Sequence, residues 1–298
     1  MAFLYADLPG DKDPWATGFF IGLDLDVGGQ LAMYLVSARH AVTDARDNGI
    51  ALSVRLNRRS GGYADLAIAD GSWVLHPTTD VAVCPIGIGA DFDYLCLGVD
   101  EDVLTDVKIE ARNEPPGDPV GGYRYPVGLG DNIFFVGLFS PHPGYEQARP
   151  VFRFGNISLM PEEPVYVELD GKGRHGYVDA YLIEARSRGG HSGAPAFLFY
   201  PMHAGPTFVA SPRPKPQLLG LVQGHFEAPT KDLAIPGDYG PRPDNAGMAV
   251  VIPAQHIVDL LMSESLPEQR AQIAEAVRRH LSAARPDAPP TGGNSPMP

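Results

Sequence analysis

The sequence is poor in cysteine and in long apolar runs, and each scarcity excludes a class of protein. Only two cysteines, Cys84 and Cys96, occur in 298 residues, whereas a secreted β-protein of this size often carries several disulfides. Both lie in apolar runs, so we expect two buried free thiols. No window approaches the roughly 20 apolar residues of a membrane span, and the N-terminus lacks the basic and apolar regions of a signal peptide. A cytoplasmic protein with no membrane partner is the resulting expectation.

Basic residues are also scarce relative to acidic ones. Lys and Arg number 23 against 36 Asp and Glu, which gives a formal net charge of −13. A surface of this sign repels phosphate backbones and anionic lipids, so we expect no nucleic-acid partner. The glycine motifs that bind phosphates or dinucleotides do not occur. The histidines show no paired spacing with Cys or Asp that resembles a zinc site, so we expect neither a metal nor a cofactor.

Helical periodicity is absent from residues 15–253, and short β-like runs take its place. The runs are rich in Val, Ile, Phe and Tyr and are separated by clusters of Gly, Pro, Asp and Asn, as in a barrel or sandwich. They cover residues 16–25, 30–38, 51–57, 80–86, 103–109, 132–139, 164–169, 176–185, 194–200, 217–226 and 247–253. The sequence therefore predicts an all-β fold over this region.

A change in composition divides the chain. Residues 111–131 hold two adjacent prolines and five glycines, which is typical of a surface connector. We expect an N-terminal β-barrel over residues 1–112, a connector over 113–131, and a C-terminal β-barrel with a closing helix over 132–262. Ile273, Val277 and Leu281 share one helical face and predict an additional helix over residues 263–285. Residues 286–298 are rich in Pro and Gly and predict a disordered tail.

One serine lies among glycines in the stretch RSRGGHSGAPAF, residues 186–197. Serine is a common turn residue, so Ser192 alone is compatible with a structural hydroxyl. A serine becomes a nucleophile only when an imidazole takes its proton and a carboxylate orients that imidazole. Gly189, Gly190 and Gly193 permit main-chain conformations closed to other residues, so the amides of Gly190 and Ser192 can both point at one developing oxyanion.

A histidine and an aspartate occur at the ends of β-like runs. His40 follows the run LAMYLV and the small residues Ser37 and Ala38, which let a turn pack closely against a barrel. Asp80 is the first residue of the run DVAVCPI, where a carboxylate at the mouth of an apolar strand is partly buried yet points at a neighbour. Taken singly, each residue is also compatible with a structural role, His40 at a strand end and Asp80 as a strand cap.

Six segments, taken together and in order, carry a family resemblance. They are TGFFI, SARHAV, HPTTDVAV, GGHSGAP, LLGLVQG and GMAVVIP. The set resembles the trypsin-like (chymotrypsin-fold) serine proteases and is most similar to the HtrA-type and bacterial trypsin-like members. The resemblance covers residues 15–262 and implies a fold of two antiparallel β-barrels, here with a C-terminal helical extension. It also implies that His40 is the general base, Asp80 its orienting carboxylate and Ser192 the nucleophile.

The same resemblance implies how a substrate is held. The amides of Gly190 and Ser192 would form the oxyanion hole. The strand Val222, Gln223 and Gly224 would pair with the main chain of a protein or peptide substrate, with Gln223 close enough to hydrogen-bond to Asp80.

Several features near Ser192 depart from the secreted digestive members of that family. His191 stands where those members have an aspartate that binds a freshly cut N-terminus, so the loop before Ser192 must be ordered in another way, by substrate or by a regulatory protein partner. Arg186 stands at the position whose side chain commonly forms the base of the primary specificity pocket in this fold. It faces either an acidic or polar substrate side chain or the solvent. Two long loops, residues 201–217 and 227–246, would lie near the substrate cleft.

Three functions compete for this pattern. The α/β-hydrolases are excluded, because their serine comes first and their histidine last, and because GHSGA lacks the final glycine of their nucleophile elbow. The leading hypothesis is a serine endopeptidase that works through an acyl-enzyme. The alternative is a regulated or inactive effector or binding module, whose oxyanion loop is ordered only by a partner.

Overall fold

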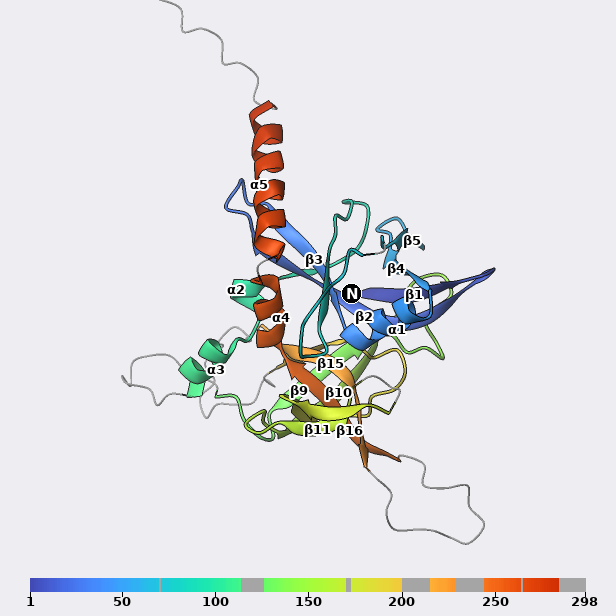
Figure 1. Ribbon diagram of the computed structural model, residues 1–298, viewed down its shortest axis with the longest axis vertical. Helices are drawn as coiled ribbons and strands as arrows, with labels where there is room; N and C mark the ends of the chain where they lie inside the picture. The colour runs from blue at the N-terminus through green and yellow to red at the C-terminus, as the bar shows by residue number, and fades with distance from the viewer. Residues whose placement is uncertain are drawn as a thin grey trace, which may run out of the picture.

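The computed structural model describes residues 1–69, 71–113, 126–169, 173–199, 215–228, 244–263 and 265–283 (Figure 1). Four stretches on which the sequence made predictions lie outside the described residues: connector residues 114–125, long-loop residues 201–214 and 229–243, and the predicted tail at 286–298. Among the described residues, no helix combines the length and the apolar character needed to cross a membrane.

The first half of the chain forms an eight-stranded sheet. Its strands are β1 (Ala2–Leu8), β2 (Asp11–Asp24), β3 (Leu31–Ser37), β4 (Ala51–Asn57), β5 (Tyr63–Ala67), β6 (Val74–Leu75), β7 (Ala82–Pro85) and β8 (Cys96–Gly98). Their order is β5-β4-β1-β2-β3-β7-β6, with β8 added beside β2. The long strand β2 links two parts of this sheet, because its first half pairs with β1 and its second half with β3. Both pairings are antiparallel, whereas β8 runs parallel to β2.

The second half forms a closed six-stranded barrel. Its strands are β9 (Asn132–Gly137), β10 (Val151–Leu159), β13 (Tyr181–Ile183), β14 (Pro195–Leu198), β15 (Gln217–Ala228) and β16 (Asp244–Pro253), closed in the order β10-β13-β16-β15-β14-β9. Between β10 and β13 the chain leaves the barrel as a two-stranded hairpin of β11 (Val165–Glu168) and β12 (His175–Val178). The predicted all-β fold of two antiparallel β-barrels is confirmed as a class. The second unit is a closed barrel, and the first is an eight-stranded sheet that is antiparallel except where β8 pairs with β2.

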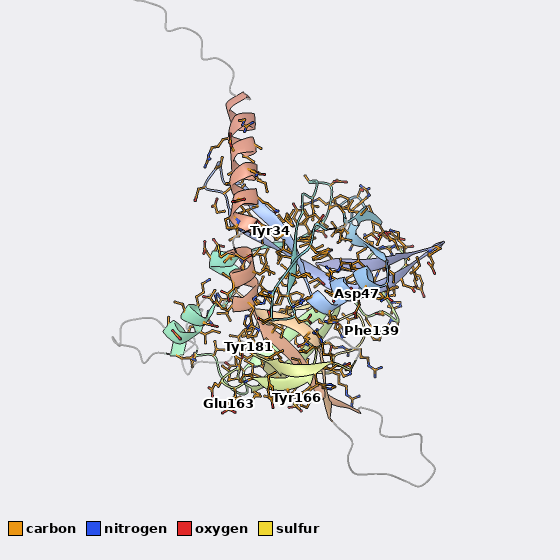
Figure 2. The ribbon with its side chains drawn as sticks, in the orientation of Figure 1. Tyr34, Asp47, Phe139, Glu163, Tyr166 and Tyr181 are labelled. Atoms are coloured by element: carbon orange, nitrogen blue, oxygen red, sulfur yellow. The ribbon has the colours of Figure 1, made fainter. Side chains whose placement is uncertain are left out.

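Each unit has its own buried core, and apolar contacts join the two. Tyr34 lies in the core of the first unit and Tyr181 in the core of the barrel, and both are almost fully buried (Figure 2). The first core continues across the junction, since Leu221 and Ile252 of the barrel belong to it. Burial of apolar surface of this kind stabilises a junction by roughly 25 cal/mol for each Å² removed from water. The two units therefore share a buried apolar junction.

Three helices lie in the region that was predicted to hold none. They are α1 (Arg39–Asp47), α2 (Val99–Asp102) and α3 (Asp106–Asn113). The strand predicted over residues 103–109 is wrong, since α3 occupies most of it and only Val103 forms an isolated bridge, to Leu218. Helix α3 has no buried side chain, so its sequence shows no apolar stripe from which a helix could be predicted. Helix α1 is only nine residues long and buries just Ala41, Val42 and Ala45.

The C-terminal helices agree with the sequence. Helix α4 (Ala254–Leu261) follows β16, and α5 (Ser265–Ala283) is the predicted helical extension. Leu266, in the first turn of α5, is fully buried against the first unit, and Arg270 donates a hydrogen bond to the carbonyl of Leu261 at 2.5 Å. Figure 1 shows the C-terminal end of α5 standing away from the β-units.

Candidate active site

Helix α1 carries His40 at its second residue, directly after β3 ends at Ser37. Ala38, between them, is extended and fully buried, and the hydroxyl of Ser37 donates to the carbonyl of Thr17 on β2 at 2.7 Å. The turn from β3 into α1 is therefore packed tightly on β2. Because a helix leaves its first N–H groups without internal partners, the backbone amide of His40 is available to an outside acceptor.

Asp80 supplies that acceptor and also orients the ring of His40. Its Oδ1 accepts from the backbone amide of His40 at 2.7 Å, and its Oδ2 lies 2.7 Å from His40 Nδ1. The Asp80 side chain is 6% exposed and that of His40 is 19% exposed. A carboxylate can only accept, so Nδ1 carries the proton and the lone pair of the neutral ring is left on Nε2.

His40 Nε2 lies 3.0 Å from the hydroxyl oxygen of Ser192. The three side chains predicted from the sequence are thus brought into one hydrogen-bonded chain, although His40 and Ser192 are 152 residues apart and belong to different β-units. In this arrangement Nε2 can accept the hydroxyl proton of Ser192, and the carboxylate of Asp80 can stabilise the charged ring that results.

The loop that leads to Ser192, residues 186–193, is here called the serine loop. Five of its carbonyls accept hydrogen bonds, and three of these belong to consecutive residues. Gly189 accepts from the hydroxyl of Ser140 at 3.0 Å, Gly190 from the hydroxyl of Thr17 at 2.6 Å, and His191 from the amide of Ala194 at 2.8 Å. A trans peptide points its N–H opposite to its C=O. The amides of Gly190 and Ser192 therefore point away from Ser140 and Ala194.

Neither of these two amides donates a hydrogen bond within the described part of the chain. In the same loop, the amides of Arg188, His191 and Gly193 each donate a hydrogen bond. Pairs of main-chain N–H groups in such positions can stabilise negative charge that develops on a carbonyl oxygen. Chemically, the arrangement is suited to nucleophilic attack on an acyl group.

A cavity of about 180 Å³ opens beside the triad. Its lining residues are His40, Glu168, Leu169, Ser187, Arg188, Gly189, Ser192, Gln223, Gly224, His225 and Val250. Leu169, which directly follows β11 of the hairpin, also lines a smaller cavity of about 50 Å³, whose lining includes Asp80. The hairpin therefore covers the cleft next to His40, a role for Glu168 and Leu169 that the sequence did not predict.

Two of the three residues predicted to bind the substrate main chain line this cavity, and one does not. Gln223 and Gly224 line it, but Val222 is fully buried. The amide of Val222 donates to the carbonyl of Ala194, and its carbonyl accepts from the amide of Gly193, both at 2.8 Å. Val222 therefore has no main-chain group to offer a substrate, and His225, which was not predicted, takes its place in the lining.

One further expectation needs correction, and the structure decides between two alternatives for another residue. The side-chain amide of Gln223 donates to the carbonyl of Glu168 at 3.0 Å, so it binds the hairpin where a bond to Asp80 was expected. Arg186 is exposed and does not line the cavity, so of its two predicted placements it adopts the one toward solvent. The lining instead contains Ser187, which is buried, and Arg188.

Among the residues that the structure describes, the remaining chemistry-bearing groups offer no rival site. Cys84 is buried and Cys96 is partly buried, and neither forms a disulfide. Burial raises the pKa of each thiol to about 11, so neither is a thiolate nucleophile near neutral pH. Within the described ranges, no group of three or more His, Cys, Asp or Glu side chains is arranged to hold a metal ion.

No known protein family matches the sequence, and no curated protein matches it. Among solved structures, the crystal structure of Deg5 is similar over 87% of this chain and 85% of that chain, with 16% sequence identity and a TM-score of 0.43. A similarity at this level carries no functional argument, so the function has to be inferred from the geometry of the site.

Proposed function

We propose that the chain is a trypsin-like serine endopeptidase. The observation that carries this proposal is the continuous chain of contacts from Asp80 through His40 to Ser192, with distances of 2.7 and 3.0 Å. The amides of Gly190 and Ser192, which donate to no group in the described part of the chain, support it. A module that only binds a peptide would not need the triad and the two amides in one arrangement.

In the proposed reaction, Ser192 Oγ attacks the carbonyl carbon of a peptide bond while His40 Nε2 accepts its proton. The amides of Gly190 and Ser192 donate to the oxyanion of the tetrahedral intermediate. As the intermediate collapses, His40 gives the proton to the leaving amine and an acyl-enzyme remains on Ser192. A water molecule, deprotonated by His40, then attacks the acyl-enzyme and releases the acid.

The expected substrate is a protein or peptide in an extended conformation. Gln223, Gly224 and His225 line the cavity from β15, and an extended chain can add to such a strand by main-chain hydrogen bonds. We further propose a cytoplasmic location, which is supported by the two free cysteines.

The alternative, a module whose oxyanion loop is ordered only by a partner, makes a different structural prediction. In a collapsed loop the carbonyl of Gly189 would turn toward Ser192 and occupy the place of the oxyanion. Here that carbonyl accepts from Ser140. The alternative is therefore less well supported than the endopeptidase.

Labelling with a fluorophosphonate probe tests the proposal directly, because the probe reacts only with a serine that has both a base and an oxyanion hole. We expect one adduct, located on Ser192 by peptide mass spectrometry. Ser192→Ala should abolish it, and His40→Ala should reduce its rate of formation by at least about 10³-fold. Ser158→Ala, which changes an exposed serine on β10, serves as the matched control.

The unlabelled enzyme should also cleave an unfolded protein such as casein, and the cleavage should stop once the probe occupies Ser192. If the folded protein forms no adduct and cleaves no casein, the endopeptidase is ruled out and the binding module becomes the better hypothesis.

A further inference from the structure

We propose that His191 and Ser140 are positioning residues, which hold the serine loop in its oxyanion-binding shape from inside the protein. The proposal rests on the proposed function, because it concerns the same loop. It replaces the substrate or regulatory partner that the sequence suggested as the source of order. It also replaces the ion pair between an aspartate and a cut N-terminus, because the residue before Ser192 is a histidine.

His191 is fully buried beneath the loop that it belongs to. Its Nδ1 accepts from the backbone amide of Arg188 at 2.9 Å, and its own backbone amide donates to the carbonyl of Arg188 at 3.0 Å. Arg188 and His191 are thus joined by two bonds that close the turn containing Gly189 and Gly190. The ring also packs edge-on against Phe135 of β9, with the ring centroids 5.3 Å apart.

The imidazole is held as a neutral acceptor. Burial lowers the pKa of His191 to about 4, and the charge of Arg153 on β10 acts in the same direction. With Nδ1 accepting, the ring proton resides on Nε2, which has no hydrogen-bond partner among the described residues. A buried donor without a partner is costly. Burial of this ring is therefore unfavourable as far as Nε2 is concerned. We infer that the contribution of His191 is the hydrogen bond from Arg188 to Nδ1, which closes the turn.

Ser140 fixes the next peptide along. Its hydroxyl donates to the carbonyl of Gly189, which turns the N–H of Gly190 to the opposite side. Gly190 has a φ of +95°, and a Cβ there would lie 2.6 Å from the Ser140 hydroxyl and 2.8 Å from the carbonyl of Leu138. The loop thus passes so close to Ser140 that only glycine fits. His191 thus closes the turn, and Ser140 sets the direction of the Gly190 amide.

Substitutions at His191 can separate the hydrogen bond from the packing. His191→Phe keeps a ring against Phe135 and removes the acceptor. His191→Asn keeps an acceptor, because Asn Oδ1 is two bonds from Cβ, as His Nδ1 is, and it removes the ring. His142→Phe, which changes an exposed histidine, and Ser158→Ala are the matched controls for these variants and for Ser140→Ala.

Two readouts are needed, and the first does not depend on activity. Hydrogen–deuterium exchange measured on peptides covering residues 186–193 should be about tenfold faster in His191→Phe and Ser140→Ala than in the wild type. The second readout is the second-order rate of fluorophosphonate labelling at Ser192. It should fall by about 100-fold in both variants, the order of a lost oxyanion donor. His191→Asn should keep exchange and labelling within about threefold of the wild type.

The opposite pattern would overturn the proposal: wild-type exchange and labelling in His191→Phe, or an Asn variant that behaves like the Phe variant. Melting temperatures establish that each variant is folded, and if His191→Phe does not fold, Ser140→Ala decides the matter in its place. A wild-type protein that is never labelled would refute the proposed function, while the exchange data would still show whether the two side chains order the loop.

Discussion

At the scale of single residues, Asp80 does two things with its two oxygens. Oδ2 orients the ring of His40, and Oδ1 accepts from the first turn of α1, so that the carboxylate fixes both the side chain and the main chain of one residue. An amide in place of the carboxylate can perform only the second task, because its nitrogen donates. A substitution of Asp80 by Asn can therefore separate its structural role from its catalytic role.

Asp80→Asn should leave the fold intact and remove most of the activity. The amide oxygen can still accept from the backbone of His40, whereas the amide nitrogen forces the ring to carry its proton on Nε2, where it cannot accept from Ser192. We expect the rate of casein cleavage to fall by about 10⁴-fold, with a melting temperature close to that of the wild type. Asp47→Asn, at the exposed end of the same helix, is the control. Loss of the fold in Asp80→Asn would mean that the carboxylate is chiefly a helix cap.

His191 should make the protein sensitive to acid. An unfolded histidine has a pKa near 6.5, whereas burial holds that of His191 at about 4. Above pH 6.5 both states are neutral, so the titration of His191 does not change folding stability there. As the pH falls from 6.5 to 4, only the unfolded state gains the proton, so folding stability should fall by about 3 kcal/mol through this window. Urea unfolding of the wild type and His191→Asn at pH 7 and pH 4 measures the difference. An equal loss in both proteins would contradict the burial of a neutral ring.

At the scale of elements, three segments converge on Gly193. Its φ is +83°, and a Cβ there would lie 2.2 Å from the carbonyl of Thr17 on β2 and 2.9 Å from the amide of Ala38 before α1. A third contact, at 2.5 Å, is to the side-chain hydroxyl of Ser37, but the contacts to Thr17 and Ala38 are to main-chain atoms, which cannot move without displacing a strand or a helix. The close approach of the serine loop, β2 and the turn before α1 is what sets the distance between His40 and Ser192.

Gly193→Ala should therefore be strongly destabilising. Strain at a positive φ and overpacking against main-chain atoms each cost about 1–3 kcal/mol, so we expect a loss of about 2–5 kcal/mol in the free energy of unfolding. Gly189→Ala, four residues earlier in the same loop, is the matched control, because a Cβ there meets nothing within 4 Å. If the two variants unfold at the same urea concentration, the packing around Gly193 is looser than described.

The sequence predicted the strands and the triad residues better than it predicted the short helices and the register of the strands. His40, Asp80 and Ser192 each stand beside a β-like run, and short motifs of that kind can be recognised locally. Helix α1 was missed because it is only nine residues long and its buried residues, Ala41, Val42 and Ala45, lie within little more than one turn, which is too short to establish a period. The assignment of Val222 to the cleft failed for another reason. Strand β15 changes register against β16 between Val222 and Gly224, and such an irregularity cannot be read from alternation.

At the scale of the whole molecule, the site exists only because two β-units meet. His40 and Asp80 belong to the first unit, and Ser192 belongs to the loop before β14 of the barrel. Thr17 connects the two directly. Its hydroxyl donates to the carbonyl of Gly190 at 2.6 Å and accepts from the amide of Leu138 at 2.8 Å, and its own amide donates to the carbonyl of Ser192 at 2.9 Å. Thr17 is fully buried, so none of these groups can turn to water.

Thr17→Val removes the hydroxyl and keeps the shape of the side chain. Two buried main-chain groups, the carbonyl of Gly190 and the amide of Leu138, then lose a partner, and each such loss costs about 1–3 kcal/mol. We expect the free energy of unfolding to fall by about 2–5 kcal/mol and labelling of Ser192 to slow, because the carbonyl of Gly190 is no longer fixed. Thr105→Val, at a partly buried threonine away from the site, is the control. Slower labelling with unchanged stability would mean that the apolar contacts alone hold the units together and that Thr17 acts only on the serine loop. Unchanged labelling would mean that His191 and Ser140 fix the loop without help from the first unit.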